Sequence, residues 1–397
     1  MPRLSPRTLR IGGHPALWGG CLAGLSVSWN LTNTGAIAQV LGTHYGTGLV
    51  PIGLLTSIAF AAEFIVMVPG GRMIDRFGAR RVALVSIAVC GLGNALLLVV
   101  PGIWGALLLR WLVGFGVGAG FVAGSVWIAE DARGRTSLGQ GLYGGIALAG
   151  AGIATGVVPL LEASLGWRSS YVTGLAVAGV ALVGAFGCSG ESGHGGSHEP
   201  TPLRVLLRST VIMRLGILHA ASFATAVVIG NWVVTLLTRR LDLAFGEAGL
   251  IGALTLLLGI VGRPLGGLLA RRSSRHAAAV VALALFGCGA ASATLAVSTS
   301  LAVDAVAAGV LGLASGLPFG IIVANAALSF PDSLGEAIGA FNLYAVTSIV
   351  VATPLVGLSF AHDRTGRVGF VALAALAVMS VAATRGLYER RGVLRDV

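Results

Sequence analysis

The stretch that decides the fold is Gly70-Gly71-Arg72-Met73-Ile74-Asp75-Arg76-Phe77-Gly78-Ala79-Arg80-Arg81. It lies between two long apolar runs, 49–69 and 82–101. Four arginines and an aspartate cannot lie in hydrocarbon, so the stretch predicts a short aqueous turn between two membrane-spanning helices. Gly78 would permit the reversal of the chain, and Gly71 the close approach of a neighbouring backbone. Asp75 can accept hydrogen bonds from a facing helix N-terminus or an arginine, which would latch two helices together.

The composition of the whole chain points to lipid as its surroundings. The 397 residues are 55% hydrophobic and 10% charged, too few polar groups to cover a water-exposed surface. At about 20 residues per span plus a turn, this length predicts twelve transmembrane helices in an all-α membrane protein. We expect the spans at about 16–41, 49–69, 82–101, 103–128, 138–161, 170–187, 211–237, 246–268, 277–298, 301–329, 336–360 and 366–386.

The chain divides into two similar halves. A polar stretch rich in Gly, Ser and His, 188–208, predicts a cytoplasmic linker between six-helix bundles at 1–187 and 209–397. Gly70-Gly71 at the end of the second span is echoed by Gly266-Gly267 at the end of the eighth, 196 residues later. Such an internal repeat predicts two pseudo-symmetric bundles that lie side by side.

Arginine placement predicts the orientation. All 26 basic residues are arginine, and 19 of them fall on the side of the 70–81 turn against 5 on the other. The positive-inside rule therefore predicts a multi-pass protein of the cell (inner) membrane with both termini cytoplasmic. The segment before Pro15 has three arginines without an apolar core and a cleavage site, so we interpret it as a cytoplasmic tail. The arginines form no single basic face, which argues against nucleic-acid binding.

The pattern G-x-x-x-D-R-x-G-x-R-R at 71–81 resembles the signature loop of the major facilitator superfamily of secondary transporters. Arg110 opens Arg-Trp-Leu-Val-Gly-Phe-Gly, which is similar to the fourth-span motif of that superfamily. The resemblance implies transport by alternating access, in which a central site opens to one side of the membrane at a time. It also implies a conformational latch that favours the outward-facing state, formed by Gly71, Asp75, Arg76, Gly78, Arg80 and Arg81.

Three charged residues stand out deep inside predicted spans: Glu63, Arg110 and Arg263. Each costs about 2.5–3.5 kcal/mol at mid-span, so we expect them to face an interior chamber. Arg263-Pro264 resembles the anion-binding arginine of monocarboxylate-type carriers, which implies substrate contact; alternatively, Arg263 begins a cytoplasmic basic cluster. For Arg110 the resemblance implies proton coupling or a charge network, and substrate contact is a further prediction; alternatively, its side chain snorkels to the surface.

Glu63 and His219 are the candidate proton-coupling residues, together with Arg110. An isolated carboxylate in a dry site can carry a proton, whereas one beside an arginine would stay ionised as a salt-bridge partner. His219 in the seventh span is either a structural hydrogen-bonding residue or a proton or substrate site. Asp304 lies near a helix end, where we expect it to be wetted.

Uncharged polar residues form a second tier of candidates. The resemblance implies that spans one, four, seven and ten line the cavity, which makes Asn30, Asn231 and Asn325 predicted substrate contacts. The alternative is that these asparagines only bond neighbouring helices.

We therefore predict proton-coupled uptake of a small organic anion, because the spans contain two cationic groups and only one acid among the residues singled out. The rival is proton-driven export of drugs or metabolites, although the fifth span lacks the Gly-Pro pair typical of exporters. An intramembrane enzyme would need a nucleophile with a base, or a metal cluster, at membrane depth, and we find neither in the sequence. We expect no cofactor and no metal, the proton gradient as driving force, a small solute and the bilayer as partners, and a monomer.

Overall fold

The computed structural model describes residues 15–129, 137–188, 203–270, 274–330 and 334–385. Every regular element in these ranges is helical. Eleven helical stretches are long and apolar enough to cross a membrane. The elements of the first half of the chain are α1 (Pro15–Trp29), η2 (Gly35–Ile37), α2 (Ala38–Tyr45), α3 (Leu49–Phe77), α4 (Ala79–Leu97), α5 (Ile103–Ala129), α6 (Ser137–Leu160), α7 (Glu162–Leu165), η3 (Gly166–Arg168) and α8 (Ser169–Phe186).

Every regular element in the described residues of the second half of the chain is also helical, and two of its spans are divided into shorter helices. Residues 203–207, predicted as part of a linker, form a short helix instead. The elements are α9 (Leu203–Leu207), α10 (Thr210–His219), η4 (Ala220–Ala224), α11 (Thr225–Leu241), α12 (Phe245–Leu257), α13 (Gly259–Ala270), α14 (Ser274–Val297), α15 (Leu301–Ser329), α16 (Leu334–Asp363), α17 (Arg367–Met379) and η5 (Ser380–Thr384). The seventh span is divided into α10, η4 and α11, and the eighth into α12 and α13.

The predicted 70–81 turn is mostly helical, so that expectation was wrong in its extent. Helix α3 continues to Phe77, and α4 begins at Ala79, so the reversal is confined to Gly78. Gly78 has a φ of 84°, a conformation that side chains with a Cβ resist. The charged residues of this stretch thus extend two helices past the apolar runs, where water satisfies them, and no separate loop is needed.

The first predicted span, 16–41, is not one continuous helix. The backbone leaves the helix at Asn30 and resumes it at Gly35, in the sequence Asn30-Leu-Thr-Asn-Thr34. Asn and Thr side chains bond nearby backbone groups and so compete with the helical ladder. The break exposes backbone carbonyls inside the protein, and these need partners.

Two other spans are interrupted close to predicted functional residues. The seventh has a π-helical turn, η4, directly after His219. The eighth breaks at Leu258, between α12 and α13, shortly before Arg263 and Pro264. π-turns and proline breaks shift the direction of the side chains that follow them.

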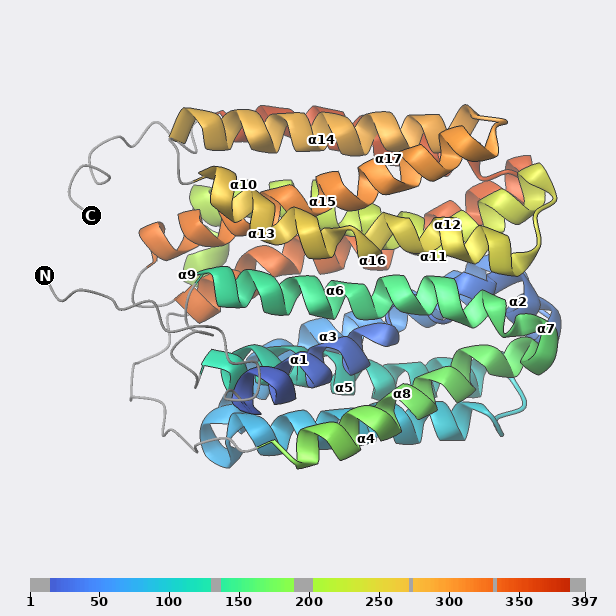
Figure 1. Ribbon diagram of the computed structural model, residues 1–397, viewed down its shortest axis with the longest axis horizontal. Coiled ribbons are helices and arrows are strands. Elements are labelled where there is room, and N and C mark those ends of the chain that lie inside the picture. The colour runs from blue at the N-terminus through green and yellow to red at the C-terminus, as the bar shows by residue number, and fades with distance from the viewer. Residues whose placement is uncertain (1–14, 130–136, 189–202, 271–273, 331–333, 386–397) are drawn as a thin grey trace, which may run out of the picture.

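The helices run side by side along the long axis of the molecule, with those of the first half gathered below those of the second half in Figure 1. Helix α6 packs against α12 and α13, and α3 packs against α16, so these pairs join the two halves of the chain. We call the end at which Gly78 joins α3 to α4 the inner end. The opposite end, where residues 46–48 join α2 to α3, is the outer end.

Candidate functional site

The three charged residues predicted inside spans are buried within the protein. Glu63 is 6% exposed, Arg110 0% and Arg263 4%. None of them faces the surroundings of the bundle, and Arg110 does not snorkel outward. Their surroundings differ, and that difference separates their roles.

Arg263 lies in an aromatic cage at the contact between the two halves of the chain. Its Cζ atom is 4.2 Å from the ring centroid of Phe319 on α15 and 5.5 Å from that of Phe223 on η4. Its Nη1 donates a hydrogen bond of 2.8 Å to the carbonyl oxygen of Gly144 on α6. Aromatic faces attract the cation, but they supply no counter-charge. In the described part of the chain no carboxylate pairs with Arg263, and its Nε has no hydrogen-bond partner.

His219 belongs to the same group of side chains. Its ring stacks on Phe223, with centroids 5.1 Å apart and planes 8° apart, and it lies 5.9 Å from the Phe319 ring. Its Nε2 is 3.2 Å from Oδ1 of Asn342 on α16. The π-turn carries Phe223, four residues after His219, so both rings stay on one face of the seventh span. We call Arg263, His219, Phe223, Phe319 and Asn342 the Arg263 cluster.

Gly144 leaves the space that Arg263 occupies. A Cβ added at Gly144 would lie 2.6 Å from Nη1 of Arg263 and 3.2 Å from the Phe319 ring. Gly144, Phe223 and Phe319 are not among the residues predicted from the sequence. Only the spacing of Phe223 from His219 offered a signal, because residues four apart share a helix face.

Arg110 lies apart from this cluster and bonds the broken first span. Its Nη2 donates to the carbonyl oxygen of Asn30 at 2.5 Å, and its Nε to that of Leu55 at 3.1 Å. Its Nη1 is 3.5 Å from Oδ1 of Asn33. The guanidinium therefore satisfies the Asn30 carbonyl that the break releases, and it adds a second bond to the Leu55 carbonyl within α3.

Glu63 is buried without a cation. Its Oε2 has no hydrogen-bond partner, and no ion pair involving it occurs among the described residues. Its backbone packs closely on α5, where a Cβ at Gly118 would approach the Glu63 Cα to 2.9 Å. Among the described residues Glu63 thus has the surroundings of an isolated carboxyl group, without a salt bridge.

The three predicted asparagines bond to other groups than the Arg263 cluster. Asn30 accepts a bond from Asn94 Nδ2 at 2.8 Å. Asn231 accepts one from Thr56 Oγ1 at 3.0 Å, which joins α11 to α3. Asn325 is half-buried, and its Nδ2 donates to the Ile321 carbonyl one turn earlier.

The structure describes the side chains of some, not all, of the predicted latch residues. Arg80 donates to the carbonyl oxygens of Phe186 at 2.7 Å and Cys188 at 2.8 Å, so here it closes the end of α8 within the first half. The close approach expected at Gly71 is absent, because a Cβ there would meet no described atom within 4 Å. Arg76 and Arg81 are exposed. The side chain of Asp75 lies outside the described residues.

The outer ends of the two halves are held together by polar contacts that the sequence did not predict. Gln39 Nε2 donates to Thr238 Oγ1 at 2.7 Å, and Arg239 Nε donates to Gln39 Oε1 at 3.0 Å. These contacts, with Thr56–Asn231, close the molecule at its outer end. Asp304, expected to be wetted, is instead buried and paired with Arg240 at 2.5 Å.

Long apolar helices that enclose charged side chains define a multi-span membrane protein with a charged interior, the class to which solute transporters belong. The chain belongs to the Major Facilitator Superfamily, whose family model matches residues 20–354.

Two curated relatives are similar to parts of the chain. A probable sulfoacetate transporter, SauU, of Cupriavidus necator is 27% identical over 269 residues, which are 60% of this chain and 60% of that protein. A putative metabolite transport protein, YyaJ, of Bacillus subtilis is 30% identical over 146 residues, which are 35% of this chain and 31% of that protein. The matches thus span less than two thirds of either relative's length.

Proposed function

We propose that this chain is a secondary active transporter that takes up a small organic anion by proton-coupled alternating access. The observation that carries the proposal is the setting of Arg263: a buried guanidinium at the contact between the two halves, with no carboxylate partner among the described residues. A charge buried without a counter-ion costs several kcal/mol. A bound anion would supply the missing counter-charge, which gives the site a reason to select anions.

The geometry of the Arg263 cluster supports recognition of a carboxylate or a sulfonate. A guanidinium can donate two parallel bonds to such a group, and Arg263 commits one nitrogen to the Gly144 carbonyl while its Nε has no partner. Phe223 and Phe319 hold the guanidinium plane and offer apolar surface for the rest of the solute. His219 would add a neutral hydrogen-bonding group from the seventh span.

Glu63 is the proposed proton carrier. A carboxyl group buried without a cation is tolerated in its neutral form and requires water or a cation when it ionises. When alternating access opens the interior to one side of the membrane, water would reach Glu63 and allow it to release or take up a proton. A proton gradient would then drive uptake.

The proposed architecture has twelve spans in two pseudo-symmetric bundles, with the first span formed by α1, the break and α2. Two glycines 198 residues apart make equivalent contacts in the two halves of the chain, which supports the repeat. Gly118 faces Glu63 on the second span, and Gly316 faces Gly262 on the eighth. The bundles would comprise 1–187 and 209–397. The arginine bias supports cytoplasmic termini in the cell membrane.

The name of the Cupriavidus relative supports a small organic anion as the solute. Sulfoacetate, the solute in the name of the Cupriavidus protein, carries a carboxylate and a sulfonate. We propose small carboxylates and sulfonates as the class of solute for this chain.

The test is uptake by the purified full chain in proteoliposomes. Labelled acetate, lactate, succinate and sulfoacetate are offered with and without an inward proton gradient. We expect at least one anion to accumulate faster with the gradient, and Arg263→Lys to lower its initial rate about tenfold, because an ammonium cannot make the forked contact. Arg168→Lys, at an exposed site on the outer end, is the matched control.

Uptake of the best anion at the wild-type rate by the Arg263→Lys variant would overturn the substrate role of Arg263. Anion release from preloaded vesicles that exceeds uptake under every gradient would favour the rival export function.

A further inference from the structure

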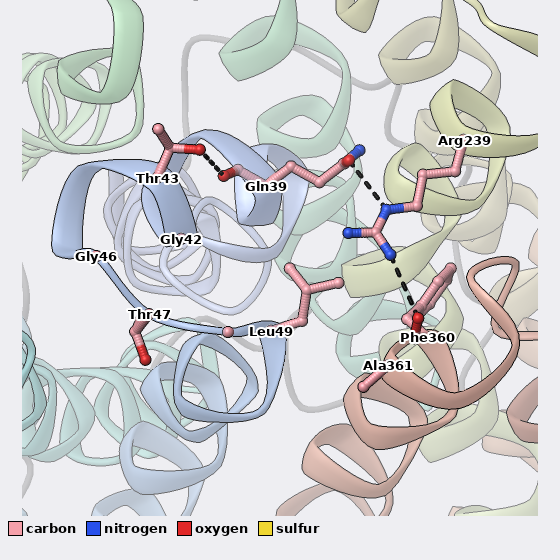
Figure 2. Close-up of a pocket in the computed structure, with 10 residues that line it drawn as sticks. Gln39, Gly42, Thr43, Gly46, Thr47, Leu49, Arg239, Phe360 and Ala361 are labelled. Carbon is pink, nitrogen blue, oxygen red and sulfur yellow. Dashed lines mark hydrogen bonds between the residues drawn. The ribbon is translucent and has the colours of Figure 1, made fainter.

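A pocket of about 610 Å³ opens at the outer end of the molecule, between the two halves of the chain (Figure 2). One wall comes from the end of α2 and the start of α3, and includes Gln39, Thr43 and Leu49. The other comes from Arg239 on α11 and from Phe360 and Ala361 on α16. The proposed transport mechanism makes no use of this pocket.

Arg239, an exposed side chain, is the one charged group among the described residues that line the pocket. Its Nε donates to Gln39 Oε1 at 3.0 Å, and its Nη1 lies 3.4 Å from the carbonyl oxygens of Phe360 and Arg364. In Figure 2 the other terminal nitrogen points into the opening between Gln39 and Leu49, with no bond drawn to it.

No carboxylate of the described residues neutralises Arg239. Asp363, two residues after Ala361, accepts bonds from the backbone N–H groups of Thr365 and Gly366 instead. Around the cation the pocket has both kinds of surface that an organic anion needs. Thr43 and Gln39 offer polar groups, and Leu49 and the exposed Ala361 offer apolar ones.

The pocket exists only while the outer ends are together. Its walls belong to different halves, and the Gln39–Thr238 and Gln39–Arg239 bonds hold them at their present separation. Opening of the outer end would carry Arg239 away from Thr43 and Leu49. A ligand that contacts both walls therefore binds the outer-closed arrangement and stabilises it.

We propose that this pocket is a second anion site, which binds an organic monoanion with a short apolar chain when the outer end is closed. The carboxylate or sulfonate would meet Arg239, and the chain would lie beside Leu49. Since the ligand favours one arrangement, it would slow the opening that uptake requires. Only this last consequence rests on the proposed function; the binding does not.

The test measures hexanoate binding to the purified full chain by isothermal titration, with hexanol as the neutral control. Ala361→Glu adds a negative charge at an exposed position of the pocket wall, and Ala361→Gln adds the same bulk without charge. We expect Ala361→Glu to weaken hexanoate binding at least tenfold and Ala361→Gln to change it less than twofold. Hexanol should not bind measurably.

Arg263→Gln separates this site from the proposed transport site. We expect hexanoate still to bind the Arg263→Gln variant, and Arg239→Gln to lose that binding. Equal affinity in Ala361→Glu and Ala361→Gln, or complete loss of binding in Arg263→Gln, would overturn the proposal. The proposed function fails on a different result, the absence of anion uptake by the wild-type chain.

Discussion

Gly144 determines how closely α6 approaches Arg263. The Gly144 carbonyl accepts the Arg263 hydrogen bond, and the missing side chain leaves space for the guanidinium. Gly141, one turn earlier on the same helix, is different, because a Cβ there would come no closer than 3.9 Å to a described atom outside its own helix. The two glycines therefore offer a matched pair of substitutions.

We expect Gly144→Ala to lower initial anion uptake about tenfold, since the added methyl group displaces Arg263 by a fraction of an ångström to an ångström. Gly141→Ala should leave uptake unchanged. Both rates are measured in proteoliposomes and normalised to the amount of inserted protein. Equal uptake by the two variants would show that the position of Arg263 against α6 does not matter for transport.

At the residue scale, the energetic cost of buried charge was enough to place Glu63, Arg110 and Arg263 inside the protein. It was not enough to assign their partners, because a charge can be met by a carboxylate, a carbonyl or an aromatic face. Arg110 meets carbonyls and Arg263 meets rings and one carbonyl. The predicted substrate and proton roles of Arg110 stay predictions.

At the scale of elements, the broken first span and Arg110 depend on each other. The break leaves the Asn30 carbonyl without its helical partner, and Arg110 donates to it. An unsatisfied carbonyl buried at this depth costs about 1–3 kcal/mol, more when the missing donor was charged. Arg110 thus has a structural role, as the donor to the Asn30 carbonyl, and is also a candidate site residue.

We expect Arg110→Met to lower the free energy of unfolding in detergent by about 1–3 kcal/mol, because the Asn30 carbonyl loses its donor and the Leu55 carbonyl loses its second one. Arg168→Met, at an exposed site, is the control. Denaturant unfolding followed by tryptophan fluorescence measures both variants. Unchanged stability combined with lost uptake would instead indicate that Arg110 serves the transported solute.

Hydrophobicity predicted the apolar helices well but not their interruptions. The long runs around α3, α5 and α15 are continuous, whereas 30–34, 220–224 and 258 depart from the α-helix. A hydropathy pattern reports which residues avoid water and carries little information on where a helix bends within lipid. The extension of α3 to Phe77 was missed for the related reason that charged residues also form helices once outside the hydrocarbon.

At the scale of the whole molecule, the outer contacts bear on the equilibrium between outer-closed and outer-open arrangements. Gln39 joins both Thr238 and Arg239 across the two halves. Loss of these bonds should favour opening, since they exist only when the halves meet.

We expect Gln39→Ala to enlarge the outer-open population about tenfold, the effect of losing roughly 1.4 kcal/mol. Spin labels at Thr43 and Ala361, two exposed positions on opposite walls, report the change as longer distances in double electron–electron resonance. The background lacks the four native cysteines. Ser164→Ala, which removes a hydroxyl bonded only to the nearby Leu161 carbonyl, is the control. Identical distance distributions in Gln39→Ala and Ser164→Ala would contradict an outer latch at Gln39.

The sequence by itself determined that this protein is a helical membrane protein of the Major Facilitator Superfamily with charge in its interior. Length, apolar content and the motif at 71–81 depend on local composition, which needs no knowledge of neighbours. Only the tertiary structure decided which side chains surround those charges. Phe223, Phe319 and Gly144 reach Arg263 from three different elements, and Gln39 reaches Arg239 from 200 residues away. Such neighbours are set by how helices pack, and packing depends on the shapes of both partners rather than on either stretch alone.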